Sequence, residues 1–523
     1  MYLTQGLKRA LQTSRNNIAT IDQINGQEQR HTWAEFGERI AKLAGAFQTL
    51  GLEKGGRVAL LALNGARYLE YYYAVPWAGG IVVPLNIRLA PPELVFLLND
   101  SGTEILIVDE TFKAMLPAFE GKLETVKHIV YAGDGIAPEG THDYEAILAA
   151  ADAIDDVEAG GDDVAGIFYT GGTTGLPKGV MLTHDNLVNN AMNTLVGLDY
   201  NTDTVYLHAA PMFHLADGAS TFAVSIMGGT HSFVPKFDPE DTLQALQSYG
   251  VTNGIMVPTM INMVANHPSV GSYNLSKLKL IGYGGSPMPE AVLLKAKEVF
   301  PTCQFLQAYG MTELSPILTI LPDEYHVTEG PLAGKIRSAG RVVYNVEAKI
   351  VDEQDQEVPR GVVGEIIARG PIVMKGYWNR PKETAEALRN GWMHTQDAGY
   401  MDEDGFIFIS DRLKDMIISG GENVYSVEVE NAIYQHPAIA MCAVIGVPDE
   451  EWGERVHAIV TCKEGQTVDE DELIAFCKER IANYKCPRSM ALRPEPMPIS
   501  GAGKILKSTL RAPYWEKQTR QVH

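Results

Sequence analysis

The sequence predicts an α/β protein: a large N-terminal domain of parallel-type sheets covered by helices, followed by a small α+β C-terminal domain. Over most of the 523 residues, short apolar runs alternate with amphipathic segments, as in parallel strands joined by helices. The pattern changes near residue 405, where a turn and the charged segment 411–415 lead into a compact mixture of strand-like and helical segments. A chain of this length accommodates several domains. We therefore expect domains at residues 1–411 and 412–523.

The first elements of the large domain follow from hydrophobic periodicity. Residues 33–50 and 66–78 have the spacing of amphipathic helices. Residues 58–63, 81–85 and 105–108 are almost wholly apolar, which is typical of strands buried on both faces of a sheet. Strands and helices that alternate in this way predict a parallel sheet.

The elements beyond this region are predicted by the same criteria. Residues 134–163 are rich in Gly, Asp and Ala and predict a surface excursion. Residues 406–409 predict a strand just before the charged segment. In the small domain, residues 440–447 and 456–461 predict strands, and residues 469–482 predict a helix.

A loop rich in glycine and threonine is the most informative segment of the chain. It follows a short apolar strand, residues 164–169, and its glycines leave backbone N–H groups open to a phosphate. A Walker loop needs Gly-Lys-Ser/Thr at the start of a helix, but here Pro177 precedes Lys178 and Gly179 follows it. The loop therefore predicts polyphosphate binding outside the P-loop ATPases and the NAD enzymes. The expected phosphate-binding residues are Thr170, Gly171, Gly172, Thr173, Thr174, Gly175 and Lys178.

Composition and charge narrow the class of partner. The 43 basic and 65 acidic residues give a net charge of −22, which disfavours nucleic acids and anionic membranes. Five scattered cysteines without a C-x-x-C pair are typical of a reducing compartment and predict neither a disulfide framework nor a zinc site. A signal-peptide core, a membrane span and a lipidation or peroxisomal signal are not recognisable. We expect a soluble cytoplasmic protein that acts on small molecules, and a homodimer is compatible with these features.

Residues 169–180 resemble the first signature of the adenylate-forming superfamily, which includes acyl-CoA synthetases, aryl-CoA ligases, luciferases and peptide-synthetase adenylation domains. Gly171 stands where many members carry serine, and this change leaves the backbone donors in place. Further segments resemble the other family motifs, in the family's order, as far as Lys504. The resemblance implies an AMP-forming acid–CoA ligase that uses ATP, Mg²⁺ and coenzyme A. It also implies a mobile C-terminal domain that rotates about a hinge at Lys414.

Residues 309–313 resemble the second family signature. In the family the threonine, here Thr312, touches the nucleotide phosphate, and the glutamate, here Glu313, holds magnesium, for which a carboxylate oxygen is a suitable ligand. Residues 282–287 follow the apolar run 278–281, and their glycines would let adenine or an acyl chain lie against bare backbone. An ordinary turn at a strand end is the alternative for that segment alone. Further expected ATP contacts are Gly284, Gly285, Ser286, Ala308, Tyr309, Gly310 and Met311.

Residues 391–397 resemble the family's W-x-x-T-G-D motif. Its aspartate, here Asp397, accepts both ribose hydroxyls in the family, and an ionised carboxylate has the acceptor-only character that a diol requires. Gln396 replaces the usual glycine, which raises the question of the local turn geometry. By the same resemblance, Arg412 also contacts the ribose.

The expected catalytic residues come from separate motifs. Residues 498–507 resemble the last family motif, where the lysine, here Lys504, bridges the acyl carboxylate and the α-phosphate during adenylation. A lone histidine beside apolar residues is more often structural than functional. The family's P-x-F/Y-H motif matches His214, however, and implies a histidine that gates the acyl pocket, whereas His208 has no match and is expected to be structural. The catalytic set is Lys504, His214, Thr312 and Glu313.

The remaining motif concerns the acceptor and the acid. In relatives, glycines like those of residues 416–425 border the tunnel that holds the pantetheine of CoA. Trp452 matches a residue that contacts the CoA adenine. The residues near the acyl pocket are small or apolar with no obvious cation, so we expect a medium- or long-chain fatty acid. The alternatives are an aromatic acid of the benzoate or cinnamate type, a non-CoA acceptor, a luciferase-like oxygenase and a non-enzymatic binding protein. The expected CoA contacts are Ser419, Gly420, Gly421 and Trp452, and the expected pocket residues are His214, Val257, Gly282, Tyr283, Gly284 and Ser315.

Overall fold

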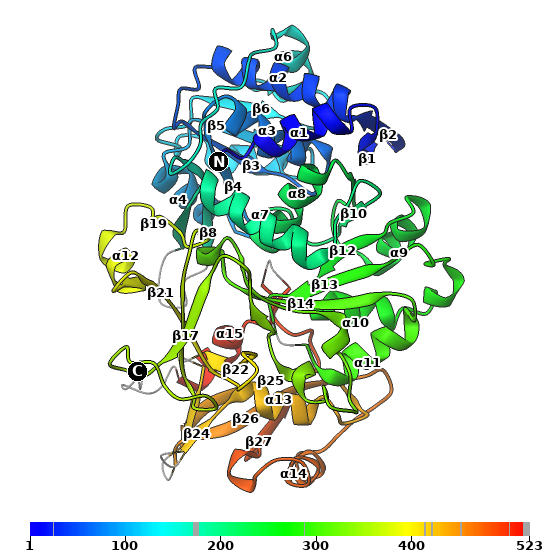
Figure 1. The fold of residues 1–523 in the computed structure, drawn as a ribbon, viewed down its shortest axis with the longest axis vertical. Coiled ribbons are helices and arrows are strands. Elements are labelled where there is room, and N and C mark those ends of the chain that lie inside the picture. The colour runs from blue at the N-terminus through cyan, green and yellow to red at the C-terminus, as the bar shows by residue number, and fades with distance from the viewer. Residues whose placement is uncertain are drawn as a thin grey trace.

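The computed structural model describes most of the chain. It confirms the predicted mixed α/β architecture, in which two large, largely parallel sheets lie in the N-terminal part and a small sheet with three helices lies at the C-terminal end (Figure 1). The expected helices and strands in the N-terminal third all form, with ends that differ by at most a few residues. The described residues are 1–24, 26–170, 177–286, 288–412, 415–419, 422–449, 452–500 and 503–515.

The first large sheet carries the second family signature. Its central strands run parallel, and antiparallel strands extend it at both ends. In sheet order the strands are β16 (Arg341–Val342), β15 (Ile317–Leu321), β14 (Gln304–Gly310), β13 (Leu280–Gly284), β12 (Asn253–Met256), β10 (Val205–His208), β11 (Thr230–Phe233), β1 (Ile18–Ile24) and β2 (Gln27–Thr32).

The second large sheet carries the two strands that flank the phosphate loop. Strands β4, β3, β5, β6 and β7 are parallel to their neighbours, whereas β8, β9 and β19 are joined antiparallel. In sheet order the strands are β19 (Gly376–Tyr377), β9 (Lys178–Thr183), β8 (Val164–Thr170), β4 (Ile81–Pro84), β3 (Arg57–Leu61), β5 (Ile105–Val108), β6 (His128–Tyr131) and β7 (His142–Asp143).

Helices cover these two sheets and fill the space between them. In α2, Thr32 and Glu35 form a reciprocal capping box, which satisfies backbone donors at the start of the helix. The helices are α1 (Gln5–Thr13), α2 (Trp33–Thr49), α3 (Ala66–Trp77), α4 (Pro91–Ser101), α5 (Leu116–Phe119), α6 (Tyr144–Ala150), α7 (His184–Leu198), α8 (Leu215–Met227), α9 (Pro239–Ser248), α10 (Pro258–Ala265), α11 (Glu290–Val299) and α12 (Pro381–Ala387).

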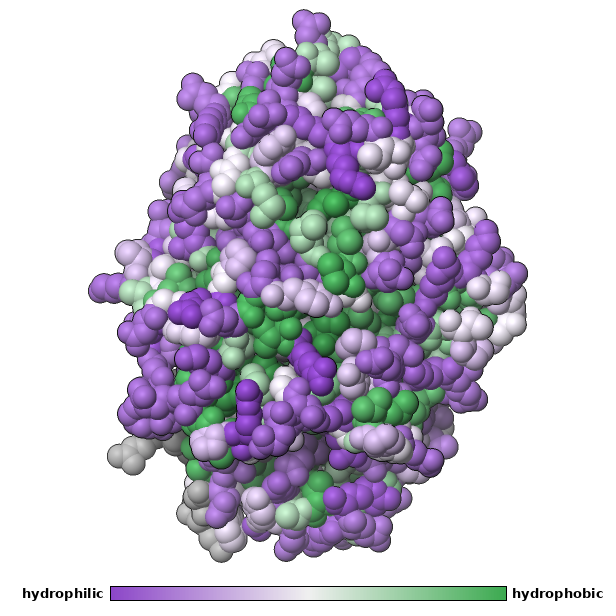
Figure 2. Space-filling view, in the orientation of Figure 1, coloured by the Kyte–Doolittle hydropathy of each residue, from purple (hydrophilic) through white to green (hydrophobic). Residues whose placement is uncertain are grey.

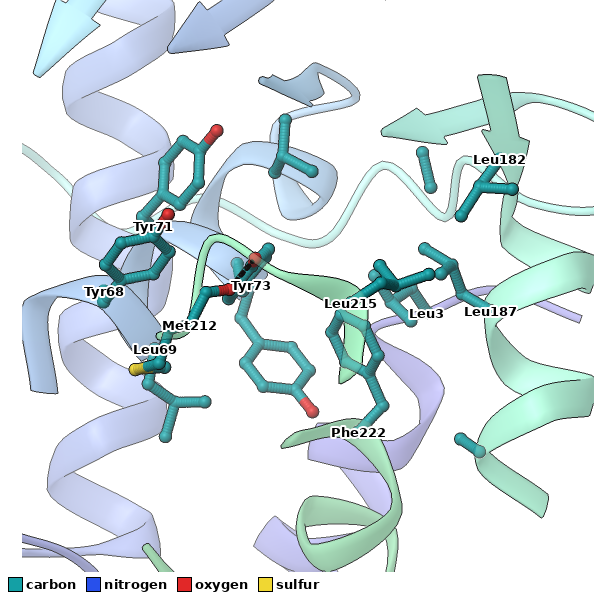
Figure 3. Close-up of a cluster of buried hydrophobic side chains, with 14 of the residues drawn as sticks. Leu3, Tyr68, Leu69, Tyr71, Tyr73, Leu182, Leu187, Met212, Leu215 and Phe222 are labelled. Atoms are coloured by element: carbon teal, nitrogen blue, oxygen red, sulfur yellow. Dashed lines mark hydrogen bonds between the residues drawn. The ribbon is translucent and has the colours of Figure 1, made fainter. Parts of the chain in front are cut away.

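The aromatic core packs around α3 and α8. Tyr73 of α3 packs edge-on against Phe222 of α8, with ring centres 6.0 Å apart, whereas Tyr68 and Tyr71 of α3 pack against each other at 5.9 Å (Figure 3). Tyr72 donates a hydrogen bond of 2.6 Å to the carbonyl of Met212, in the segment that leads to α8. The core therefore fixes the position at which α8 begins.

Two smaller sheets complete the fold. The third sheet is antiparallel, with strands β17 (Glu347–Val351), β18 (Gly364–Arg369), β21 (Trp392–Met401), β20 (Leu388–Arg389) and β22 (Ile407–Arg412), of which the sequence analysis predicted β22 alone. The C-terminal sheet contains β24 (Glu422–Val424), β23 (Ile417–Ser419), β26 (Gly453–Cys462), β25 (Ile439–Asp449) and β27 (Ser489–Leu492). Its helices are α13 (Ser426–Ile433), α14 (Glu470–Lys478) and α15 (Lys507–Trp515).

Two predictions about the outside of the molecule can be compared with the structure. Residues 134–163 are more than a surface excursion, because they contain α6, whose Tyr144 is fully buried and donates a hydrogen bond to Glu70.

Hydrophilic residues cover most of the face in Figure 2, and apolar residues gather in a band across its middle. Among the described residues, no helix is long and apolar enough to cross a membrane. The domain boundary between residues 411 and 412 stays a prediction, because Lys414 lies outside the described residues.

Candidate active site

The strands on either side of the phosphate loop form an antiparallel hairpin. Thr170, at the end of β8, lies opposite Lys178, at the start of β9, so both flank the mouth of the loop. The loop residues Gly171, Gly172, Thr173, Thr174 and Gly175 lie outside the described residues. A strand rather than a helix follows the loop, as Pro177 predicts, and this excludes the strand–loop–helix arrangement of a Walker site.

A tyrosine joins Lys178 to the glutamate of the second signature. Tyr377 in β19 donates a hydrogen bond of 2.9 Å from its hydroxyl to Oε1 of Glu313, and Nζ of Lys178 lies 5.1 Å from the centre of its ring. Glu313 is only 6% exposed. Burial raises the pKa of Tyr377, and the Glu313 carboxylate raises it further, so the phenol stays protonated as a donor. The sequence analysis missed Tyr377, because only the pairing of β19 with β9 brings it to the loop.

A second tyrosine–carboxylate pair lies at the expected ribose position. The hydroxyl of Tyr309 donates a hydrogen bond of 2.7 Å to Oδ2 of Asp397, which is 6% exposed. Gln396 has a φ of 60°, so the turn keeps the left-handed geometry that the family's glycine adopts without strain. Asp397 lies opposite Arg412 in the pairing of β21 with β22, but the Arg412 side chain lies outside the described part of the chain.

Adjacent strand ends form a surface of bare backbone between these pairs. Gly284 at the end of β13 pairs with Ala308 of β14, and a side chain at position 284 would collide with the Ala308 carbonyl. A side chain at Gly310 would likewise collide with the carbonyl of Pro316. Gly285 follows with a φ of 81°. The absence of side chains at positions 284 and 310 therefore lets neighbouring backbone segments lie in close contact.

The loop that carries Lys504 is docked on this surface. A Cβ built on Gly285 would lie 3.4 Å from Cε of Lys504, so the lysine side chain passes over that glycine. Thr259 donates a hydrogen bond of 3.1 Å to the Gly503 carbonyl, and Nη1 of Arg88 donates one of 2.8 Å to the Ser500 carbonyl. Arg88 and Thr259 belong to the N-terminal part, so the lysine loop of the C-terminal part is in contact with the N-terminal part.

The expected histidine lies within electrostatic range of this lysine. His214 precedes the first residue of α8, and its buried Nε2 has no hydrogen-bond partner among the described residues. Burial lowers the pKa of His214 to about 3, and the positive charges of Lys504 and Arg88 act in the same direction. The imidazole is therefore neutral at pH 7. His208 is fully buried and bonded to Asp217 and His231, as expected of a structural histidine.

The structure divides the expected pocket residues into two groups. Gly282 shares a face of β13 with Gly284, and Val257 packs against Gly503 of the lysine loop. Tyr283 points to the opposite face, where its hydroxyl lies 2.8 Å from Nε2 of His326. Ser315 is 1% exposed and donates its hydroxyl to the carbonyl of Ile372. Tyr283 and Ser315 therefore do not join His214, because strand alternation and backbone bonding direct them elsewhere.

The expected CoA residues meet at one end of the C-terminal sheet. Ser419 pairs with Gly453, the neighbour of Trp452, and its buried hydroxyl has no partner among the described residues. The guanidinium of Arg488 lies 4.1 Å from the centre of the Trp452 ring. Gly420 and Gly421 lie outside the described residues.

The carboxylates of the site fit one mode of magnesium binding. Within the described ranges, no group of three or more His, Cys, Asp or Glu residues converges as a metal site. Magnesium is usually bound through one or two carboxylates together with substrate phosphates. The single buried carboxylate of Glu313, near Lys178 of the phosphate loop, fits this mode of binding.

Known proteins share this architecture over nearly the whole chain. Feruloyl-CoA synthases from Amycolatopsis sp and Streptomyces sp are each 42% identical over 92% of this chain and 93% of their own. The long-chain-fatty-acid–CoA ligase FadD13 of Mycobacterium tuberculosis is 34% identical over 93% of each chain. The crystal structure of ATP-bound MatB from Rhodopseudomonas palustris superposes with a TM-score of 0.86 at 29% identity and covers 98% of this chain and 99% of its own.

Two family models match the chain. The model of the AMP-binding enzymes matches residues 7–378, and the model of the AMP-binding enzyme C-terminal domain matches residues 428–504. The motifs, the fold and these matches agree. The chain therefore belongs to the AMP-binding enzyme family and is an AMP-forming acid–CoA ligase of the adenylate-forming superfamily.

Proposed function

We propose that this ligase activates an aromatic carboxylic acid of the hydroxycinnamate type in two half-reactions at the site described above. The carboxylate first attacks the α-phosphorus of ATP, which forms the acyl-adenylate and releases pyrophosphate. The thiol of coenzyme A then attacks the acyl carbon, which forms the thioester and releases AMP. The observation that carries this proposal is the docking of Lys504 over Gly285, within electrostatic range of the neutral His214.

In the first half-reaction Lys504 neutralises the negative charge that accumulates between the carboxylate and the α-phosphate. This is electrostatic stabilisation by a pre-positioned group, because the loop is held at Ser500 and Gly503 before the substrates react. Thr170 and Lys178 bind the leaving phosphates, and Asp397 binds the ribose. Glu313 would hold magnesium, which neutralises phosphate charge when it binds together with ATP.

The uncharged state of His214 matters for the acid. A neutral imidazole within electrostatic range of Lys504 adds no positive charge that would bind a second carboxylate, and it can donate one hydrogen bond to the reacting carboxylate. This agrees with an acid that carries a single carboxyl group on an otherwise uncharged body.

In the second half-reaction the C-terminal domain rotates about Lys414. The rotation removes Lys504 from the site and brings Ser419, Gly420, Gly421 and Trp452 towards it, so that one site serves two reactions in turn. The contacts that dock the lysine loop support this step, since each of those described is a hydrogen bond to a carbonyl that can be exchanged for water.

One comparison supports an aromatic acid. The relatives named feruloyl-CoA synthase are 42% identical to the chain, against 34% for the named fatty-acid ligase. A medium- or long-chain fatty acid, which the apolar pocket residues favour in the sequence, is the second candidate.

The test is a panel of acids in an assay for CoA-dependent AMP formation. We expect kcat/KM for ferulate to exceed the values for benzoate, octanoate and palmitate by about tenfold or more, since one misfitting group in a pocket changes binding by about 1–3 kcal/mol. A preference for octanoate or palmitate would replace the aromatic acid with a fatty acid. If none of the acids supports CoA-dependent AMP formation, the proposed reaction is contradicted.

A further inference from the structure

A buried carboxylate lies beside the expected hinge. Asp411 is the penultimate residue of β22, and its backbone pairs with Ala398 of β21, next to Asp397. It is 3% exposed. Its position is therefore fixed by pairing with β21, the strand that carries the expected ribose-binding residue Asp397.

This carboxylate contacts the part of the chain beyond the hinge. Oδ2 of Asp411 accepts two hydrogen bonds from Ser426, one from the backbone N–H and one from the hydroxyl, each 2.6 Å long. Ser426 is fully buried and is the first residue of α13 in the C-terminal part. The contact thus joins residues on opposite sides of Lys414.

The network continues to the base of the lysine loop. Nζ of Lys507 donates a hydrogen bond of 2.6 Å to the hydroxyl of Ser426 and pairs with Oε1 of Glu430 at 2.7 Å. Burial by itself lowers the pKa of Lys507, but Glu430 and Asp411 outweigh burial and raise it, so the lysine stays charged. Lys507 begins α15 directly after the loop that delivers Lys504.

We propose that Asp411 is a positioning residue whose bonds to Ser426 hold the C-terminal part in the arrangement that forms the acyl-adenylate. The proposal rests on the proposed function, in which this part rotates about Lys414. Rotation moves Ser426 relative to Asp411, so the bonds exist in one arrangement and favour it. They are buried and involve a carboxylate, so they contribute more than the exposed contact of Arg88 with Ser500.

The simpler alternative is that Asp411 only caps α13 and stabilises the fold. A structural role would slow both half-reactions together, through loss of folded protein. A positioning role slows adenylate formation alone, because thioester formation requires the Asp411–Ser426 bonds to be broken.

The test measures the two half-reactions separately in Asp411→Ala and Asp411→Asn. Rapid-quench assays would follow adenylate formation from ATP with ferulate or octanoate, without CoA, and thioester formation from the purified acyl-adenylate with CoA. We expect adenylate formation to slow about tenfold or more in Asp411→Ala, at unchanged KM for ATP, since bonds to charged groups are of that size. We expect a smaller loss in Asp411→Asn, which keeps an acceptor, and an undiminished rate of thioester formation in both.

The matched control is Asp238→Asn. Asp238 caps α9 through the backbone N–H groups of Glu240 and Asp241, entirely within the N-terminal part, and should leave the ratio of the two rates unchanged. If Asp411→Ala does not fold, Ser426→Ala removes the hydroxyl and keeps the backbone donor, and should give a smaller change of the same kind.

Equal slowing of both half-reactions, or no change in either, would overturn the positioning role. Failure of the proposed function has a different result, namely wild-type protein that forms no adenylate from either acid.

Discussion

The groups around the nucleotide and the lysine that completes the site are held in different ways. Glu313 and Asp397 are nearly buried, and each accepts a hydrogen bond from a tyrosine that a sheet strand fixes. The Lys504 loop belongs to the C-terminal part, and Arg88 and Thr259 hold it through bonds to its backbone carbonyls. The expected binding groups are preorganised, whereas the proposed catalytic lysine is carried on a loop whose described hydrogen bonds to the N-terminal part are accepted by its backbone carbonyls. This difference is what two successive reactions in one site require.

Removal of the lysine should give the largest effect and test the separation most strongly. Lys504→Ala should slow acyl-adenylate formation by about 10²–10³-fold, because a preorganised charge at the reacting centre is lost. Thioester formation from supplied acyl-adenylate should stay within about twofold of wild type, since the lysine has left the site by then. Rapid-quench measurement of each step checks this. Lys463→Ala, which alters an exposed lysine of the C-terminal part that donates to the Pro437 carbonyl, serves as the control.

The second effect concerns the free energy of unfolding, which should depend on pH through buried histidines in both parts. Burial lowers the pKa of His457 in the C-terminal part, and of His326 in the N-terminal part, to about 4. Between pH 6.5 and 4 the unfolded chain binds protons that the folded imidazoles do not, so the free energy of unfolding falls as the pH falls. His457→Gln should remove about 1 kcal/mol of this loss between pH 7 and pH 5, after allowance for partial exposure.

Urea denaturation at pH 7 and pH 5 measures this change. Asp22, whose pKa burial raises to about 6, acts in the opposite direction, but it is common to both proteins and cancels in the comparison. An identical pH slope for wild type and His457→Gln would be inconsistent with a neutral buried imidazole.

A smaller effect should follow from loss of one tyrosine hydroxyl in the preorganised cluster. Tyr377→Phe removes the bond to Glu313 and should lower kcat for adenylation about tenfold, as expected for one hydrogen bond to a charged group. The loss should appear at saturating ATP and magnesium. Tyr249→Phe removes an exposed phenol that contacts Gln23 and should leave kcat unchanged. Unchanged kcat in Tyr377→Phe would show that the strand alone fixes Glu313.

The smallest effect concerns the turn beside Asp397. Gln396 has a φ of 60°, where a side chain costs about 1 kcal/mol, so Gln396→Gly should raise the free energy of unfolding by about 0.5–1 kcal/mol. Asn379 has a φ of 53°, and asparagine tolerates this region, so Asn379→Gly should gain less. Thermal unfolding of both variants measures the difference. A destabilised Gln396→Gly would mean that the side chain is needed in the turn.

The sequence motifs predicted which residues form the candidate site better than they predicted which residues contact them. Pro177 was enough to exclude a helix directly after the phosphate loop, because proline limits the conformation of its neighbour, and a strand is found there. Tyr377 could not be found, since it lies in no motif and reaches Glu313 only through the pairing of β19 with β9. Tyr283 was assigned to the pocket although strand alternation places it on the other face from Gly282. Local sequence records the chemistry of a residue, whereas its neighbours depend on pairing between distant segments.

The most direct measurement is the distance between the two parts during turnover. Spin labels at the exposed positions Glu120 and Glu464, in a Cys462→Ser background, report on the N-terminal and C-terminal parts, and labels at Glu120 and Lys236 form the control pair within one part. Pulsed electron–electron double resonance would measure the distances in the adenylate-bound protein and in the same protein after addition of CoA. We predict that the 120–464 distance changes on addition of CoA while the 120–236 distance stays constant. Thioester formation with both distances unchanged would contradict a removable lysine.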